Sequence, residues 1–385
     1  MKVAIIDPSA FTPQYDHCLA NTLSKKGCKV VLASTLLPRE LRGKETNYQY
    51  WEHFYRLGSK LPKSKIRTYI KGLEHPLDTI RLIKQLRCFS PDVIHFQWLP
   101  FPAIDNLFLT KFREIAPLVL TVHDTEPFNN APSSKLQLLG FQSVLRCFDH
   151  YIVHTQYSKL ALEKQLEIPA QRISVIPHGV FSYYKEIISK MEPPSQWAQS
   201  GGKKKILFLG VLKPYKGVDV LLRAFAHLPK EISKDAVLQI VGYPKMPVGP
   251  LKDLTQRLGI ENQVLWDLRY LEESEVAAYF ASSDVVVLPY RRIDQSGVLM
   301  IAIAFCIPII ATNVGGIAEI IKNRTHGILV EPDNVKALAQ ALEYILSDDN
   351  TREQMKKALQ DLSTGELSWE SVAKKTICVY QKLKR

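Results

Sequence analysis

The sequence predicts an α/β protein built from two doubly wound parallel sheets. Short apolar runs recur along the 385 residues, and segments with helical spacing separate them. The length exceeds what a single hydrophobic core usually supports, which predicts two domains. A stretch at 192–205 is rich in proline, glycine and lysine and interrupts the alternation, as an interdomain linker does.

The candidate strands are predominantly apolar, as expected for strands covered on both faces of a parallel sheet. In the first half they lie at 3–6, 30–33, 93–96, 118–122, 151–153 and 173–176. After the interruption they lie at 206–209, 237–241, 264–266, 285–288, 307–311 and 328–330. Ligands of such sheets bind where the strands end, so two rims facing each other would enclose a cleft.

The most informative stretch is 206–217, where a buried strand leads into a turn that carries Lys213 and Lys216. Gly210 ends the strand, and apolar residues on one broad face predict a helix at 218–228. Positive charge beside the N–H groups of a helix start suits an anionic phosphate. The stretch lacks the spacing of a Walker A motif, so a basic surface loop remains an alternative.

Composition excludes several classes of protein. Hydrophobic residues make up 46% and charged residues 23%, and no apolar run reaches the length of a membrane span. The first residues predict a strand rather than a secretory signal. The six cysteines are scattered without the spacing of a zinc site or a disulfide framework, which favours reduced thiols in a cytoplasmic protein.

The net charge of +12 is concentrated in the first half, and residues 51–71 hold a basic run with aromatic neighbours. The cations are Arg56, Lys60, Lys63, Lys65, Arg67 and Lys71, and the aromatic residues are Trp51, Phe54, Tyr55 and Tyr69. This combination suits an anionic membrane surface, and a solvated loop is the alternative. No nucleic-acid-binding motif accompanies the run, so nucleic acid is not an expected partner.

Ordered motifs over nearly the whole chain resemble the retaining GT-B glycosyltransferases of family 4. They are PDVIHFQW at 91–98, TVHD at 121–124, SVIPHGV at 174–180, FLGVLKPYKGVDVLLRAF at 208–225, SSDVVVLPYR at 282–291, the segment 296–321, and GILVEPDN at 327–334. The resemblance implies two Rossmann-like domains around a central cleft. It places the acceptor-side domain at 1–192, a linker at 193–205, the nucleotide-sugar domain at 206–360, and a terminal helix at 361–385 that packs back on the first domain.

The resemblance also implies a donor site in the second domain. Lys213 and Lys216 match basic positions that contact the donor diphosphate, and Val211 stands where many relatives have arginine. Asp294 matches the first of two family glutamates, whereas the second falls on Ile301 or Ala302, which are apolar. The remaining positions implied in donor binding are Gly210, Tyr290, Ser296, Gly297, Val298 and Glu319. Glu319 is equally well interpreted as a carboxylate that stabilises a helix start.

On the acceptor side, His123 matches the family histidine that lies against the transferred hexose. Asp16 and His17 are expected to line the acceptor site, while His95, His154 and His178 are expected in turns or in the core. The residues implied in catalysis are therefore His123, Lys213, Lys216 and Asp294.

The implied reaction moves a sugar from a nucleoside diphosphate sugar to a hydroxyl of a glycan or lipid-linked saccharide, with retention of anomeric configuration. No acidic pair of DxD type ends a donor-domain strand, so neither a metal nor another cofactor is expected. The expected location is cytoplasmic, peripheral at the inner face of the membrane. A nucleotide-sugar 2-epimerase and a catalytically silent nucleotide-sugar-binding protein are the alternatives.

Overall fold

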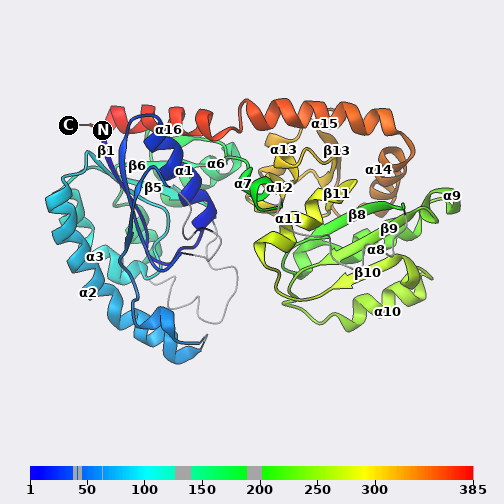
Figure 1. The fold of residues 1–385 in the computed structure, drawn as a ribbon, viewed down its shortest axis with the longest axis horizontal. Helices are drawn as coiled ribbons and strands as arrows, with labels where there is room; N and C mark the ends of the chain where they lie inside the picture. Colours follow the sequence, from blue (N-terminus) through cyan, green and yellow to red (C-terminus); the bar gives the residue numbers. More distant parts are fainter. Residues whose placement is uncertain (38–40, 42–45, 63, 126–139, 189–201, 385) are drawn as a thin grey trace. The chain divides into compact units, whose positions relative to one another are not determined.

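The computed structural model describes residues 1–37, 41, 46–62, 64–125, 140–188 and 202–384 (Figure 1). The chain divides into two compact units, Met1–Gly179 with Trp369–Arg385, and Val180–Ser368. Most of the linker expected at 193–205 lies outside the described residues, and its last two lysines belong to a strand of the second unit.

The first unit contains a parallel sheet with strand order β3-β2-β1-β4-β5-β6-β7. Its strands are β1 (Lys2–Asp7), β2 (Lys29–Ser34), β3 (Gln49–Glu52), β4 (Val93–Phe96), β5 (Leu118–Val122), β6 (His150–Val153) and β7 (Ile173–Val175). The order reverses between β1 and β4, which creates the switch point where open α/β sheets bind ligands. The edge strand β3 was not predicted, because it is short and begins and ends with polar residues.

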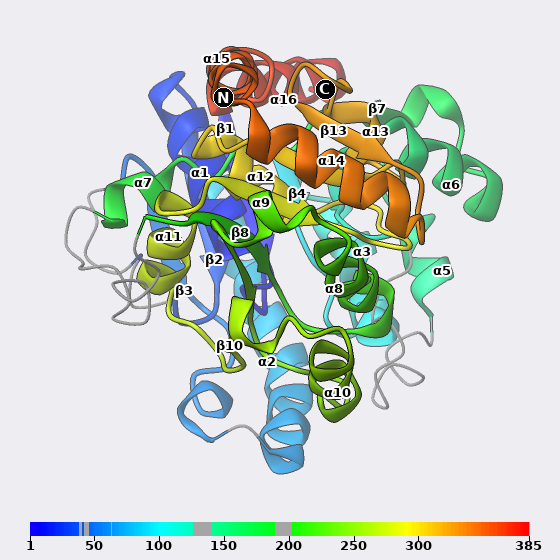
Figure 2. The ribbon, with the colours of Figure 1, turned by 90° about the vertical axis from the view of Figure 1, so that its right-hand side faces the viewer.

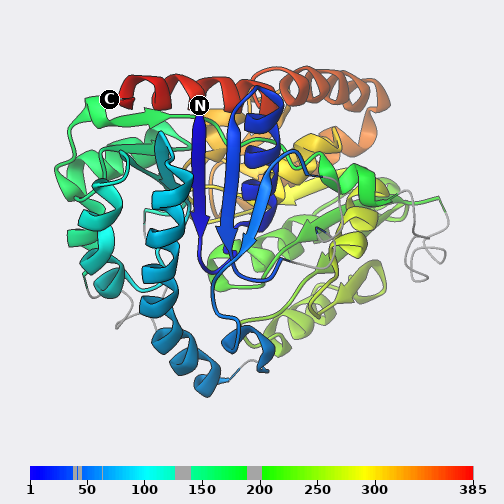
Figure 3. The ribbon, with the colours of Figure 1, turned by 60° about the vertical axis from the view of Figure 1, so that its left-hand side comes forward.

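Helices cover both faces of this sheet. They are α1 (Pro13–Lys25), α2 (Lys65–Phe89), α3 (Pro102–Arg113), α5 (Phe141–Leu145), α6 (Gln156–Leu166) and α16 (Trp369–Leu383), with 3₁₀ turns η2 (Gly58–Lys60) and η3 (Ala170–Arg172). Helices α2 and α3 lie side by side in front of the strands in Figure 3, and α16 packs against α1. Figure 3 also shows the first turns of α2 extending beyond the carboxyl ends of β1 and β2.

The second unit contains a parallel sheet with strand order β10-β9-β8-β11-β12-β13. Its strands are β8 (Lys204–Leu209), β9 (Ala236–Val241), β10 (Val264–Asp267), β11 (Val285–Leu288), β12 (Ile309–Thr312) and β13 (Gly327–Val330). Its helices are α7 (Tyr183–Ile187), α8 (Val218–Ala226), α9 (Lys230–Ser233), α10 (Gly249–Arg257), α11 (Glu273–Ala281), α12 (Gly297–Ala304), α13 (Ile317–Ile320), α14 (Val335–Ser347) and α15 (Asp349–Thr364), with 3₁₀ turns η6 (Pro214–Lys216) and η7 (Glu261–Gln263). Helices α8, α10 and α14 lie on one side of this sheet, and α7 and α11 lie on the other (Figure 2). The predicted fold class of two doubly wound parallel sheets is confirmed.

The last helix joins the first unit through two side chains. The Tyr380 hydroxyl lies 2.6 Å from Nδ1 of His95 on β4. A Cβ atom on Gly179 would lie 2.5 Å from the indole of Trp369, so only glycine lets this ring lie so close to the backbone. Helix α16 therefore belongs to the core of the first unit, although it is last in sequence.

The segment before α2 corrects one sequence expectation. Phe54 and Tyr55 are buried in the core of the first unit, so they do not face a membrane surface. The segment is fastened to α2, since the Glu74 carboxylate accepts the N–H groups of Leu57 and Gly58, each at 2.8 Å. None of the described helices is both long enough and apolar enough to cross a bilayer.

Candidate active site

Two glycines bring the ends of β8 and β9 together in the second unit. Gly210 has φ 146° and Gly242 has φ 131°, a region that glycine adopts without strain. A Cβ atom on Gly242 would clash with the carbonyl oxygen of Gly210, so a larger residue would separate the two strand ends. At this edge the backbone of one strand end therefore lies directly against that of the other.

The lysine-bearing turn packs on the end of β11. Lys213 precedes the single 3₁₀ turn η6, and Gly217 follows it with φ 67° before α8 begins. A Cβ atom on Gly217 would clash with the carbonyl oxygen of Pro289. This close contact fixes where the turn lies relative to the following strand.

Lys216 is held over an aromatic ring. Its Nζ lies 3.6 Å from the ring centroid of Tyr290, and the residue is only 9% exposed. Tyr290 is fully buried, so its ring provides a fixed, low-dielectric surface for the cation. Lys213 is placed differently, with its Nζ 5.7 Å from the ring of Tyr215, and Val211 is 40% exposed beside Gly210.

Arg291, which the sequence analysis did not assign to the site, fastens the same turn. Its backbone N–H donates to the carbonyl of Tyr215 at 2.7 Å. Its guanidinium donates two hydrogen bonds to Asp219, at 3.1 and 2.8 Å, and one to Asp333 at 2.7 Å. The neighbouring Asp219 carboxylate raises the pKa of Arg291 further. One side chain thus joins η6, α8 and the segment before α14.

The segment from β11 to α12 completes this edge. Ser296 caps α12, since its hydroxyl accepts the N–H of Leu299 at 3.3 Å, and Gly297 and Val298 form the first turn. A Cβ atom on Gly210 would lie 3.9 Å from Val298, which shows that α12 begins beside the end of β8. The carbonyl of Asp294 accepts the N–H of Gly316 at 3.0 Å. Gly210, Val298 and the lysine turn therefore share one edge of the second sheet.

The position of the second family glutamate, at 301 or 302, is buried, whereas the position of Glu319 is exposed. Ile301 and Ala302 are buried in α12 as part of the hydrophobic core. Glu319 is exposed on the four-residue helix α13.

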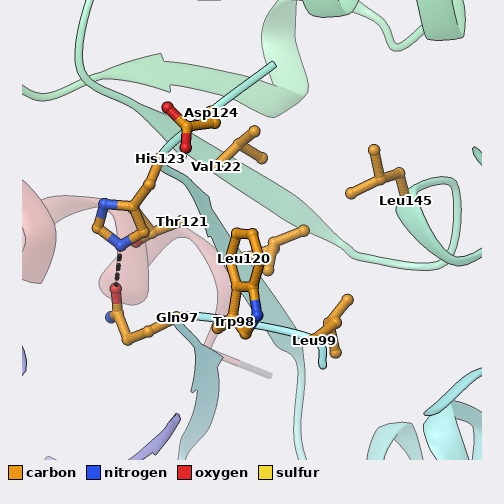
Figure 4. Close-up of a pocket in the computed structure, with 9 residues that line it drawn as sticks. All are labelled: Gln97, Trp98, Leu99, Leu120, Thr121, Val122, His123, Asp124 and Leu145. Atoms are coloured by element: carbon orange, nitrogen blue, oxygen red, sulfur yellow. Dashed lines mark hydrogen bonds between the residues drawn. The ribbon is translucent and has the colours of Figure 1, made fainter. Parts of the chain in front are cut away.

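In the first unit, His123 lies at the carboxyl end of β5 and is buried. Its Nε2 is 3.2 Å from Oε1 of Gln97 (Figure 4). Its Nδ1 is 3.2 Å from Nε2 of His154. Nδ1 of His154 in turn lies 3.0 Å from the carbonyl oxygen of Ile176. Side chains that follow β4, β5 and β6 are therefore joined in one hydrogen-bonded chain.

These histidines are neutral at neutral pH. Burial, together with neighbouring His154, His178 and His95, lowers the pKa of His123 well below its usual value. Burial lowers the pKa of His154 to about 4 and, with His154 beside them, the pKa of His95 and of His178 to about 3. The expected core role of His95, His154 and His178 agrees with their burial.

Tyr15 on α1 packs against this cluster. Its ring centroid lies 4.9 Å from His123, 4.9 Å from His178 and 5.1 Å from Trp369. Burial raises the pKa of the Tyr15 hydroxyl. The histidines are therefore enclosed by aromatic rings from both the first and the last helix of the unit.

Two buried carboxyl groups lie at the end of β1. Asp7 accepts the N–H groups of Ser9, Phe11 and Thr12 at 3.1, 2.6 and 3.3 Å. Asp16 on α1 is hydrogen-bonded to Asp7, and burial raises the pKa of both carboxyls, that of Asp16 more strongly. Burial therefore favours the protonated form of this pair, and of Asp16 in particular.

The two residues assigned to the acceptor side have different surroundings. Asp16 is 1% exposed, and within the described part of the chain its Oδ1 has no hydrogen-bond partner. His17 is buried with its Nδ1 2.9 Å from the Tyr48 hydroxyl.

A pocket opens beside His123 (Figure 4). It is lined by Gln97, Trp98, Leu99, Leu120, Thr121, Val122, His123, Asp124 and Leu145. Phe11 stacks on Trp98 with ring centroids 4.0 Å apart, and it is largely exposed. Among the described residues, no group of three or more His, Cys, Asp or Glu side chains is arranged to hold a metal ion.

Two family models match the chain, one for each half. The model described as Glycosyltransferase Family 4 matches residues 15–181, and the model described as Glycosyl transferases group 1 matches residues 190–361. The first match covers strands β2 to β7 of the first sheet, and the second covers all six strands of the second sheet.

Individual relatives agree with these matches. An uncharacterized glycosyltransferase of Methanocaldococcus jannaschii is 31% identical over 75% of this chain and 75% of its own length. A D-inositol 3-phosphate glycosyltransferase of Xylanimonas cellulosilytica is 27% identical over 75% of this chain and 71% of its own. Among solved structures, HepE of Anabaena in complex with UDP is similar with a TM-score of 0.73 at 18% identity, covering all of both chains.

Replacing Gly217 by alanine tests the packing of the lysine turn on β11. Gly259 has nearly the same φ, 66° against 67°, but a Cβ atom there meets open space. Gly259→Ala should cost about 1 kcal/mol of unfolding free energy from backbone strain alone. Gly217→Ala should cost about 1–3 kcal/mol more from the added clash, as measured by urea denaturation. Equal losses would contradict the close contact with Pro289.

The buried Asp16 carboxyl predicts a specific dependence of stability on pH. A carboxyl whose pKa in the folded state lies above its unfolded value of about 3.9 binds its proton more tightly when the protein is folded. Its contribution to stability is complete at pH values below the unfolded pKa, and it is lost as the pH rises to the folded-state pKa. Relative to Asp16→Asn, the wild-type free energy of unfolding should therefore fall between pH 5 and pH 8. The decline should be about 1.4 kcal/mol per pH unit while Asp16 remains protonated.

Asp92 provides the control for this measurement. A hydrogen bond from the Lys2 N–H lowers the pKa of Asp92, so this residue is ionised in both states throughout the same pH range. The difference between wild type and Asp92→Asn should stay constant from pH 5 to pH 8. A constant difference for Asp16→Asn as well would show that Asp16 is not held protonated.

Proposed function

Because the chain belongs to the group 1 glycosyltransferases, we propose that it transfers a sugar from a nucleoside diphosphate sugar to a hydroxyl acceptor with retention of configuration. The observation that carries this proposal is Lys216, fixed over Tyr290 at the carboxyl edge of the second sheet. A cation held in a low-dielectric site without freedom to reorganise is suited to stabilise a leaving diphosphate.

The donor is a UDP-sugar in this proposal. The complex of HepE with UDP, and a further one with UDP-glucose, come from a protein that shares the fold over its whole length. In our chain the diphosphate would lie between the lysine turn and the start of α12. Lys213, Lys216 and the N–H groups of Gly297 and Val298 would contact its oxygens.

Chemistry at this edge is electrostatic. The acceptor hydroxyl forms a bond to the anomeric carbon on the face that the diphosphate leaves, the bond from that carbon to the phosphate oxygen breaks, and a diphosphate oxygen takes the hydroxyl proton. Lys216 and the α12 amides stabilise the negative charge that develops on the diphosphate. We assign the Asp294 carboxylate to hydroxyls of the sugar and require no metal.

On the acceptor side, His123 would contact a hydroxyl of the transferred sugar. Asp16 retains its proton, and its unpartnered Oδ1 lies on α1 in the same unit. We assign Asp16 to a hydroxyl of a glycan or lipid-linked acceptor. The exposed ring of Phe11, supported by Trp98, offers an apolar surface for such an acceptor at the same edge.

Two other functions fit the same fold and predict different products. A nucleotide-sugar 2-epimerase would convert the donor without any acceptor. A catalytically silent binding protein, motivated by Val211 and by apolar Ile301 and Ala302, would bind the donor without hydrolysis or transfer. We favour transfer because Lys216 retains the fixed cation that a departing diphosphate needs.

A second surface supports an acceptor that resides in a membrane. Helix α2 exposes a row of large apolar side chains spaced three or four residues apart, which places them on one face: Ile66, Tyr69, Leu73, Leu77 and Ile80. Leu57 adds to it, and Arg56 and Lys60 are exposed nearby in sequence. An apolar helix face beside cations suits the surface of an anionic bilayer.

The residues that form the proposed membrane surface therefore differ from those of the predicted run at 51–71. Tyr69 is exposed as expected, whereas the apolar contribution comes mainly from α2 beyond residue 71. Lys63 lies outside the described residues. We propose that the α2 row, Ile66 to Ile80, lies on the cytoplasmic face of a membrane and brings the edge near lipid-linked acceptors.

Lys216→Met tests the catalytic proposal, because it keeps the apolar stem on Tyr290 and removes the charge. Turnover with a UDP-sugar should fall about a hundredfold, equivalent to about 3 kcal/mol of lost stabilisation. UDP should also raise the melting temperature of the variant less than that of wild type. Lys252→Met on the exposed surface of α10 is the control and should leave both quantities unchanged. Unchanged turnover in Lys216→Met would refute the phosphate role.

Leu73→Gln tests the membrane proposal. Leu73 is 74% exposed on α2 and Leu160 is 62% exposed on α6, so both substitutions affect similar surface leucines. Leu73→Gln should weaken binding to phosphatidylglycerol vesicles about tenfold, the cost of withdrawing one leucine from an apolar phase. Leu160→Gln should bind like wild type.

Charge contributes separately to the same measurement. Neutralising Arg56 and Lys60 together should weaken vesicle binding by about 2 kcal/mol at low salt, since each cation near the surface contributes about 1 kcal/mol. If the variant lacking both charges and the Leu73→Gln variant still sediment with vesicles as wild type does, the proposal is contradicted.

A further inference from the structure

The hydrogen-bonded chain behind His123 has a direction that the geometry determines. It begins at the carbonyl of Ile176 after β7 and continues through His154 and His123 to Gln97. A carbonyl oxygen only accepts hydrogen bonds, so Nδ1 of His154 must carry the proton at this 3.0 Å contact. Nε2 of a neutral His154 then has no proton and accepts.

The next link follows from the first. Nδ1 of His123 lies 3.2 Å from the unprotonated Nε2 of His154, so it must donate. Burial and three neighbouring histidines lower the pKa of His123, which leaves one proton on its ring. That proton is on Nδ1, and Nε2 of His123 is therefore unprotonated and accepts.

Gln97 must then present its amide nitrogen to His123. An unprotonated ring nitrogen 3.2 Å from a carbonyl oxygen would place two lone pairs against each other, and the orientation of a glutamine amide is fixed only by its hydrogen bonds. With the amide turned, Gln97 donates to His123 and its oxygen faces the His95 ring, 3.4 Å away. His95 also contacts the hydroxyls of Thr121 and Tyr380, either of which can donate to it.

We propose that His154 is a positioning residue that holds His123 in the tautomer with the proton on Nδ1, so that Nε2 is an obligatory hydrogen-bond acceptor. In the free protein this nitrogen accepts from Gln97. When a sugar binds it accepts from a hydroxyl and disfavours a carboxylate, which cannot donate. The first part concerns the protein alone, and the preference for a hydroxylated over a carboxylated sugar rests on the proposed transferase function.

The tautomer is measured directly by NMR of the full chain labelled with ¹⁵N only in histidine. At pH 7 the His123 ring should show one protonated and one unprotonated nitrogen, with the proton on Nδ1. A cationic ring, or a proton on Nε2, would overturn the proposal whether or not the protein transfers sugars.

His154→Phe removes the acceptor for His123 at similar volume. The proton of His123 should then distribute between its two nitrogens, and kcat/KM with UDP-glucose should fall about tenfold, the effect of losing one hydrogen bond. His154→Gln supplies an amide oxygen to Nδ1 of His123 and should restore the tautomer and most of the rate. An unaltered His123 spectrum in His154→Phe would overturn the proposal.

His150→Phe is the matched control. His150 lies on β6, is buried like His154, and burial also lowers its pKa to about 4, but its Nε2 lies 2.9 Å from the Ser174 hydroxyl. Its replacement should leave the His123 spectrum and kcat/KM unchanged. A matching change in His150→Phe would show that any buried histidine of β6 disturbs the site, which would also overturn the proposal.

The preference for hydroxyl over carboxylate has its own test. Wild type should use UDP-glucose at least tenfold more efficiently than UDP-glucuronic acid, and His154→Phe should reduce this ratio. An unchanged ratio would overturn the specificity part. Absence of transfer from any UDP-sugar would instead refute the proposed function and leave the NMR result standing.

Discussion

The close approach of backbone to backbone at the carboxyl edge of the second sheet is the constraint on which the proposed donor site depends. Glycines at 210, 217, 242 and 315 all have positive φ, and a Cβ atom at the last three would clash with a carbonyl oxygen of a neighbouring segment. Side chains at these positions would separate the lysine turn, the end of β9 and the segment before α12. Contacts between main-chain segments thus form this edge, and they fix the position of the turn that carries Lys213 and Lys216. Side chains add to this packing: Arg291 donates hydrogen bonds to Asp219 and Asp333, and Lys216 lies over the ring of Tyr290.

Burial has different consequences for charge at the carboxyl edges of the two sheets. In the second unit the cation of Lys216 is held over the ring of Tyr290 and is 9% exposed. In the first unit, burial removes charge instead: His123 and its neighbours are neutral, and the Asp7–Asp16 pair retains a proton. Neutral histidines bind hydroxyls through directed hydrogen bonds, whereas a lysine binds phosphate without strict direction.

Sequence patterns predicted the strands and the lysine turn because each is a local property: apolar runs form buried strands, and glycine ends them. They did not predict β3, whose polar ends give no such run. They placed Phe54 and Tyr55 on the surface, because the local sequence does not distinguish an aromatic residue that faces a membrane from one that faces the core. Arg291 was missed because its role depends on Asp219 and Asp333, which are distant in sequence. The direction of the histidine chain also required coordinates, since it follows from one carbonyl contact after β7.

The apolar residues at 301 and 302 follow from the packing of α12. From Leu299 to Ala304 every residue of this helix is buried, so a carboxylate there would need a bound ligand to offset its desolvation. Apolar side chains at 301 and 302 avoid this cost in the ligand-free unit. In the proposed donor site, binding then relies more on the diphosphate, through Lys213, Lys216 and the first turn of α12. Salt screens contacts between exposed charges strongly and contacts between buried charges much less. Because Lys216 is buried over Tyr290, its attraction to an anion should weaken little at physiological ionic strength.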